Sequence, residues 1–197
     1  VGTALCSSFG GVAAMNMIIV DAAMRGRGMG RALMERAMAL GNGCEMRLVA
    51  TPDGLPLYEK LGFKATGRIL QHQGIARATT PERPVSTGTP DDIARLAQMD
   101  KAASGLSRKT LLATIAAGGE VLTLEDGKVV GPIVAKDPAG ARALMAEAAN
   151  RCAGQFLRVD LVEEGGLADD AEKLGLAHAG GGIAMRRAST NAASPDF

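Results

Sequence analysis

The chain has 197 residues, of which 22 are Lys or Arg and 21 are Asp or Glu. This length suits one large domain or two small ones. The near balance of charge argues against nucleic acid or a membrane surface as the main partner. Hydrophobic residues make up 47% of the chain and aromatic residues 3%, so methionine and alanine are expected to fill much of the core.

The three cysteines, Cys6, Cys44 and Cys152, are an odd number without the spacing of metal ligands. They predict a reduced, cytoplasmic compartment and no metal site. Residues 1–20 are apolar, but they lack a basic start, and polar residues and glycines interrupt them. We therefore expect neither a signal peptide nor a membrane span there.

The first part of the chain, residues 1–78, alternates between strand and helix patterns. The apolar run at 12–20 predicts a strand that is buried on both faces. A glycine-rich corner follows at 25–30. Apolar residues at helical spacing then predict a helix over 29–40, which the Gly-Asn-Gly of residues 41–43 ends.

Three further elements complete this part: a strand at 45–50, a short helix at 55–63, and a strand that begins at Phe63 and continues toward Ala76. The alternation predicts an α/β fold whose mixed sheet has a parallel component. The methionines near the corner are interpreted as core filling, namely Met15, Met17, Met29, Met34 and Met38.

Residues 79–90 are rich in proline and threonine and predict a linker between two domains. The second domain, 91–187, resembles the first in its order of elements, and the polar tail 188–197 is expected to be flexible. Its predicted elements are helices at 91–99 and 106–117, a hairpin at 120–131, a short strand before Asp137, a helix at 139–150, a strand at 156–162, a short helix at 167–174 and a strand at 182–186.

The glycine-rich corner has the features of an anion site. The first amides of a helix have no partner within the helix, and its N-terminus carries partial positive charge. Glycines let a ligand approach the backbone closely, and guanidinium groups add formal charge. We therefore predict that the corner binds a phosphate or pyrophosphate. A P-loop is excluded because the corner has no lysine, and the glycine spacing differs from the dinucleotide fingerprint.

The pattern that fits is R-x-x-G-x-G, Arg25 to Gly30, followed by "PLYEKLGF" at 56–63. Together these motifs resemble the acetyl-CoA loop and a second motif of the GCN5-related N-acetyltransferase (GNAT) superfamily. The resemblance covers residues 12–68. It implies a mixed α/β GNAT fold, and the second half resembles a diverged copy, so the whole chain resembles a tandem acetyltransferase.

The resemblance also implies roles for individual residues. The backbone of Ile18, Ile19 and Val20 would pair with the pantetheine arm of acetyl-CoA. The pyrophosphate would lie at the loop, which comprises Arg25, Gly26, Arg27, Gly28, Met29, Gly30 and Arg31. Tyr58 would protonate the departing CoA thiolate, although a packing role for this aromatic residue is the alternative.

The sequence departs from the family pattern in three places. Thr51 stands where many members have an asparagine that contacts CoA, and Met46 stands where some have a glutamate base. Only about eleven residues precede the CoA-binding strand, whereas the family has several elements there. Either segments are absent from the sequence, which we prefer, or the two halves share one composite sheet.

In the second half, Asp137 places negative charge where a pyrophosphate would lie, so we expect no CoA there. His72 is expected at a surface or hairpin position, with a substrate-site role as the alternative, and His178 in a turn without a role.

The leading hypothesis is an acetyl-CoA-dependent N-acetyltransferase for an amine of a small molecule or protein, without nucleic-acid or membrane partners. The alternatives are a non-catalytic acyl-CoA sensor and a structural homodimer.

Overall fold

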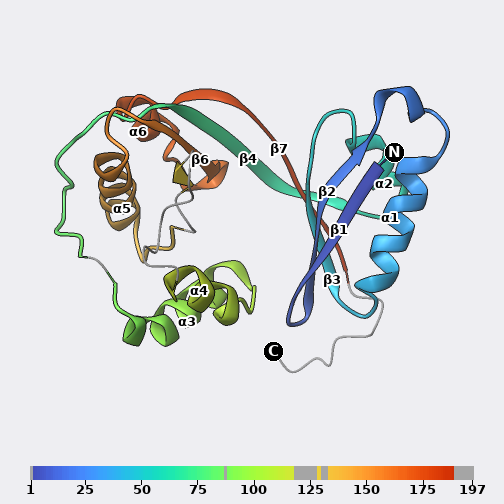
Figure 1. Cartoon of the computed structure of the whole chain (residues 1–197), viewed down its shortest axis with the longest axis horizontal. Helices are drawn as coiled ribbons and strands as arrows, with labels where there is room; N and C mark the ends of the chain where they lie inside the picture. Colours follow the sequence, from blue (N-terminus) through green and yellow to red (C-terminus); the bar gives the residue numbers. More distant parts are fainter. Residues whose placement is uncertain (1, 87, 118–127, 130–132, 189–197) are drawn as a thin grey trace. The chain divides into compact units, whose positions relative to one another are not determined.

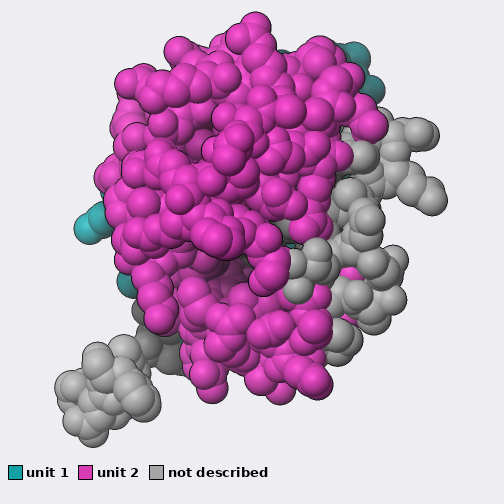
Figure 2. Space-filling view, turned by 90° about the vertical axis from the view of Figure 1, so that its left-hand side faces the viewer, with its two compact units in different colours: residues 1–67, 182–197 teal, residues 68–181 magenta. Residues whose placement is uncertain are grey.

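The computed structural model describes residues 2–86, 88–117, 128–129 and 133–188 (Figure 1). The chain divides into two compact units, which Figure 2 shows in two colours. Unit 1 consists of residues 1–67 and 182–197, and unit 2 consists of residues 68–181. The chain therefore leaves unit 1 after its first third and returns to it near the C-terminus.

Unit 1 begins with an antiparallel hairpin of β1 (Gly2–Phe9) and β2 (Val12–Val20). A 3-10 turn (Ala22–Met24) and the glycine corner lead into α1 (Met29–Leu40), which packs against both strands. β3 (Glu45–Ala50) and α2 (Leu55–Lys60) follow. The predicted bounds of the strand at 12–20, the helix at 29–40 and the strand at 45–50 are confirmed, whereas β1 was not predicted.

The core of unit 1 forms between the sheet and the apolar side of α1. Met34 and Ala37 are the buried residues of that helix. They meet alternate residues of the strands, because successive strand side chains point to opposite faces. The buried cluster comprises Ala13, Met15, Met34, Ala37, Met46, Leu48, Ala50, Tyr58, Phe63 and Met185.

One strand of unit 1 comes from the far end of the chain. β7 (Ala177–Arg187) lies antiparallel to β3, with Met46 opposite Arg187 and Ala50 opposite Ile183. Met185 of β7 is 1% exposed and belongs to the core of unit 1. The predicted last strand at 182–186 therefore exists, but it completes the sheet of the first motif.

Unit 2 is built on β4 (Lys64–Ile75), whose residues from Ile69 onward pair antiparallel with β6 (Phe156–Val162). β5 (Lys128–Val129) is parallel to β6. A buried cluster joins β6 and the end of β4 to α5 (Pro138–Arg151) and α6 (Ala168–Lys173). The remaining helical segments are Pro90–Asp92, α3 (Ile93–Ser104), α4 (Lys109–Ala117) and Glu163–Gly165.

The hydrogen-bonded strand order is β1-β2-β3-β7-β4-β6-β5. Strands from both halves of the sequence therefore belong to one hydrogen-bonded sheet, as the alternative of a composite sheet predicted. The described residues between 79 and 89 contain neither helix nor strand. The domain boundaries at 78 and 91 stay predictions, because the compact units divide the chain at other places.

Several local predictions are wrong. β2 is buried only in its first half, since Met17 is 58% exposed and Ile19 is 54% exposed. Met17 therefore does not fill the core. His72 lies on β4 and is 1% exposed, because it shares a sheet face with the buried Val159 opposite it.

Residues 133–135 form no strand, and most of the predicted hairpin at 120–131 lies outside the described residues, as do residues 189–197 of the tail. Among the helices of the described residues, none combines the length and apolar character that a bilayer crossing requires.

Candidate functional site

The second half of β2 contains a bulge. Thr3 of β1 lies opposite Ile19, whereas Leu5 lies opposite Asn16, so β2 has one extra residue between these pairs. Met17 absorbs it with a φ of 50°, and its carbonyl accepts a hydrogen bond from Thr3 Oγ1 at 2.7 Å. A bulge turns the strand that follows it. The bulge therefore sets the direction of residues 18–20, which are predicted to pair with the pantetheine arm of CoA.

The two central strands of unit 1 pair for only a short distance. β2 and β3 are parallel, and their register runs from Val12 opposite Glu45 to Ala14 opposite Arg47. Beyond these residues, β2 pairs on its other side with β1, and β3 pairs on its other side with β7. The facing backbone edges at residues 18–20 and 48–50 thus lie beyond the shared register, and an extended ligand could pair with either of them.

The glycine corner needs glycine for backbone conformation. Gly26 and Gly28 have φ values of 74° and 76°, which other residues rarely adopt. A Cβ at either position would have no neighbour within 4 Å, so space is not the constraint. Gly30 has ordinary φ and lies inside α1, where a Cβ would come within 3.5 Å of Leu57. The left-handed backbone conformation of the turn thus explains Gly26 and Gly28, but not Gly30.

The amides at the start of α1 are available to a ligand. Gly28 is the N-cap, so it offers no side chain, and the first turn has no acidic residue. Within residues 2–67, the backbone hydrogen bonds of this helix begin at Ala32. Its amide donates to the Gly28 carbonyl at 3.0 Å. The amides of residues 29–31 point out of the helix end together with its dipole.

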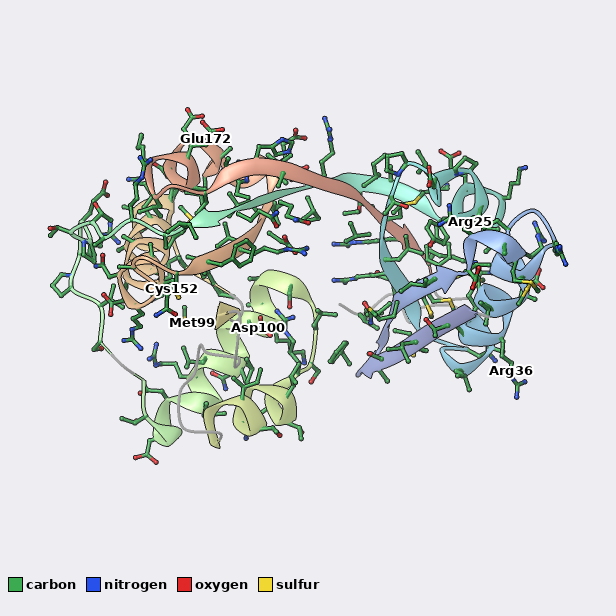
Figure 3. The ribbon with its side chains drawn as sticks, turned by 45° about the horizontal axis from the view of Figure 1, so that its top comes forward. Arg25, Arg36, Met99, Asp100, Cys152 and Glu172 are labelled. Carbon is green, nitrogen blue, oxygen red and sulfur yellow. The ribbon has the colours of Figure 1, made fainter. Side chains whose placement is uncertain are left out.

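Three exposed arginines lie within a few residues of this helix end, namely Arg25, Arg27 and Arg31, and Figure 3 labels Arg25. Arg25 donates from Nε to the Val20 carbonyl at 3.4 Å, which ties the corner to the end of β2. Arg31 forms an exposed ion pair with Glu35 at 3.1 Å. Asp21 caps the preceding 3-10 turn, where its Oδ1 accepts from the Ala23 amide at 2.9 Å. The arrangement can bind an anion through backbone amides and guanidinium groups.

Tyr58 lies on α2 and is 7% exposed. Its ring meets Phe63 edge to face, with centroids 6.3 Å apart, and also packs against Gly54, where a Cβ would come within 2.7 Å of the ring. Burial raises the pKa of the Tyr58 phenol. The hydroxyl therefore stays protonated at neutral pH, as a proton donor must.

Thr51 lies where β3 ends, and its side chain is exposed. Its carbonyl accepts hydrogen bonds from the amides of Gly54 and Leu55, each at 3.0 Å, which fixes the turn into α2. Glu45, adjacent to the position where a base was sought, pairs instead with Arg47 on the same sheet face. The Glu45 carboxylate is therefore engaged in a salt bridge with Arg47.

The corresponding helix end in unit 2 is already filled. Asp137 is the N-cap of α5 and accepts from the Gly140 amide at 2.7 Å. The same carboxylate binds Arg83 at 3.0 Å. The Gly140 amide and the Arg83 guanidinium hold the pKa of Asp137 below its usual value. The Asp137 carboxylate thus occupies the N-terminus of α5, where the phosphate of a ligand would otherwise bind.

Comparison with known families adds a second line of evidence. An acetyltransferase (GNAT) domain model matches residues 1–65, and a second acetyltransferase (GNAT) domain model matches residues 96–196, which is half of the chain. The chain belongs to the GNAT acetyltransferase family. The tandem arrangement of two such domains stays a prediction.

Individual relatives agree with this family. YitH of Bacillus subtilis, an uncharacterized N-acetyltransferase, is 29% identical over 130 residues, which are 62% of this GNAT chain and 46% of YitH. The chain thus spans less than half of that relative.

Two solved structures are similar in fold. The crystal structure of a protein from Pyrococcus horikoshii described as a "putative acetyltransferase" has a TM-score of 0.74 at 22% identity, over 95% of this chain and 69% of the other. A GCN5-related N-acetyltransferase from Sphaerobacter thermophilus has a TM-score of 0.61 at 16% identity, over 93% and 75%.

Sequence reasoning missed three features of this GNAT site. The hairpin with β1 was signalled by Gly10-Gly11 between two apolar runs. The bulge at Met17 has no signature in composition. The pairing of β7 with β3 joins residues more than a hundred positions apart, and no local pattern encodes such a contact.

Proposed function

We propose that this GNAT chain is an acetyl-CoA-dependent N-acetyltransferase that acts on an amine of a small molecule or a protein. The observation that carries the proposal is the uncapped N-terminus of α1 beside exposed Arg25, Arg27 and Arg31. Such an end suits a diphosphate. The end of the β2–β3 register at residues 14 and 47 supports a place for the pantetheine arm.

Each predicted residue has a role in this proposal. The amides of residues 26–31 hold the pyrophosphate, and the backbone of residues 18–20 pairs with the pantetheine arm. Thr51 contacts the coenzyme at the end of β3. The acceptor amine forms a C–N bond with the thioester carbonyl carbon while the C–S bond breaks. Tyr58 gives a proton to the CoA sulfur, and the amine releases its proton to solvent.

Tyr58→Phe tests the chemical step. General acids contribute about 10²- to 10⁴-fold to rates, so kcat with an amine acceptor should fall by about that factor. The dissociation constant for acetyl-CoA, measured by calorimetry, should change little. Because burial raises the Tyr58 pKa above its ordinary value near 10, ionisation of this acid should not reduce kcat of the parent protein below about pH 10.

The alternative is a non-catalytic acyl-CoA sensor, which the lack of an assigned base favours. Acetyl-CoA would then stabilise the protein against heat, but a panel of amines would release no free thiol. Release of thiol that Tyr58→Phe abolishes would contradict the sensor. If acetyl-CoA neither binds nor raises the melting temperature, both forms of the proposal are wrong.

The second half is proposed to be a degenerate copy of a tandem arrangement that does not bind CoA. Its support is the Asp137 carboxylate at the start of α5, which would repel a pyrophosphate. Asp137→Gly removes this carboxylate without adding a cation, and it should not create a second CoA site when acetyl-CoA binding is measured by calorimetry. The cysteine pattern supports a cytoplasmic protein, and the balanced charge supports a protein without nucleic-acid or membrane partners. The proposal is compatible with a homodimer.

A further inference from the structure

Unit 2 contains a cavity of about 530 Å³ that the proposed acetyl transfer does not use. All its described lining residues lie between Arg83 and Arg151, so it is distinct from the glycine corner of unit 1. A volume of this size is typical of sites for small organic ligands.

The walls of the cavity are mainly apolar. α3 contributes Ile93, Leu96 and Met99, which share one helical face, and Figure 3 labels Met99 beside Asp100. α4 contributes Leu112 and Ile115, also on one face. The apolar sides of both helices therefore face the cavity, and they favour a ligand with an aliphatic body.

The acidic residues of the lining are already neutralised. Each of the four carboxylates has an arginine partner within 4.0 Å, in the pairs Asp92–Arg95, Asp100–Arg108, Asp137–Arg83 and Glu147–Arg151. A cationic ligand would have to displace an arginine from one of them. The lining thus offers little attraction to an amine.

Lys136 differs from these groups. It lines the cavity and is exposed, and among the described residues the structure records no ion-pair partner for it. Among the described lining residues, Lys136 is therefore the one positive charge without an ion-pair partner, and its side chain is exposed. An ammonium group in this position suits a single carboxylate at the end of an apolar ligand.

We propose that unit 2 has a second ligand site, which binds an aliphatic monocarboxylate in this cavity. The chain of the ligand lies against Leu96, Met99 and Leu112, and its carboxylate pairs with Lys136. This site is independent of acetyl-CoA and of the proposed acetyl transfer, and it binds its ligand without forming a covalent bond.

The test is calorimetry of the whole chain with octanoate and, separately, with octan-1-ol. Octanoate should bind in a saturable way with one site per chain. Lys136→Gln should weaken octanoate about fivefold and leave octan-1-ol unchanged, whereas Lys101→Gln, an exposed lysine of α3 outside the lining, should change neither.

A second variant tests the place of binding. Leu96→Trp fills the cavity, and it should weaken octanoate about tenfold or more. The matched control is Leu111→Trp, because Leu111 is 44% exposed on α4 and does not line the cavity. The chain has no tryptophan, so emission reports each new indole: blue-shifted for Leu96→Trp and solvent-like for Leu111→Trp.

Three results would overturn the proposal: no saturable octanoate binding to the parent chain, equal octanoate affinity in Leu96→Trp and Leu111→Trp when both remain folded by circular dichroism, or equal losses in Lys136→Gln and Lys101→Gln. Acetyl-CoA binding should be the same in all four variants. A loss of acetyl-CoA binding confined to Leu96→Trp would show that the two sites are one, which also contradicts the proposal.

Discussion

Asp100 is one of two polar residues that the described part of the chain buries, and it is 2% exposed. Its two oxygens accept from Arg108, Nε to Oδ2 at 2.7 Å and Nη2 to Oδ1 at 2.6 Å. The hydrogen bond to Asp100 raises the pKa of Arg108. This pair joins the C-terminal turns of α3 to the segment that precedes α4.

Asp100→Asn should therefore destabilise the protein strongly. Loss of one partner leaves the other charge without compensation, and for a buried pair this costs about 3 kcal/mol. Urea unfolding followed by circular dichroism measures the free energy of unfolding. The matched control is Asp160→Asn, because Asp160 binds Arg158 in the same two-bonded way, with both bonds at 2.9 Å, but on the surface.

The Asp160→Asn control should cost no more than about 1 kcal/mol. Equal losses for the two variants would mean that the geometry of the pair, and not its burial, determines its contribution. The sequence did not predict the pairing of residues 100 and 108, because that pairing depends on a turn without a sequence motif.

At the scale of single elements, the corner before α1 is the most instructive case. Gly28→Ala places a Cβ in open space but in a left-handed conformation, which costs about 1–2 kcal/mol for an ordinary residue. We expect that loss in the free energy of unfolding and a weaker affinity for acetyl-CoA, both measurable on the same preparation. Gly28→Asn should lose less, because asparagine tolerates this conformation.

Gly11→Ala serves as the control for Gly28→Ala. A Cβ at Gly11 would also meet open space, but the φ of Gly11 is outside the left-handed range. The Gly11→Ala variant should therefore keep its stability and its coenzyme affinity. If both alanine variants behave alike, the conformation of the corner does not explain its glycines.

The sequence predicted elements well where a local period was strong. The strands at 12–20, 45–50 and 156–162 and the helix at 29–40 have their predicted bounds. It failed where a distant contact overrides the local pattern. His72 lies between glutamines, a setting typical of a surface residue, yet its pairing opposite Val159 turns it toward a core.

The candidate site divides in the same way. The loop, Tyr58 and Thr51 were found from motifs, since their spacing along the chain is fixed. The bulge at Met17 and the short β2–β3 register were not, because they result from the pairing of three strands. Motifs are therefore enough to propose the site residues, whereas the proposed place for a coenzyme arm depends on the pairing of the sheet.

At the scale of the whole molecule, unit 1 depends on residues 182–187. They supply the antiparallel partner of β3 and the buried Met185. A chain that ends at Gly181 should therefore lose acetyl-CoA binding and the cooperative unfolding of unit 1, as measured by calorimetry and thermal unfolding. The milder Met185→Ala should cost about 2–5 kcal/mol and retain binding at low temperature.

Unchanged coenzyme affinity in the shortened chain would contradict this dependence. A matched chain that ends at Ala188 keeps all of β7 and is expected to bind as the parent does. The comparison separates the strand from the residues that follow it.

The return of β7 to unit 1 also has a consequence during protein synthesis. Residues 68–181 leave the ribosome as one continuous stretch, but β3 waits for its partner until that stretch has been made, which takes roughly ten seconds at ordinary elongation rates. During this interval the open edge of β3 can pair with a neighbouring nascent chain. Faster translation of the inserted segment should therefore raise the yield of correctly folded protein.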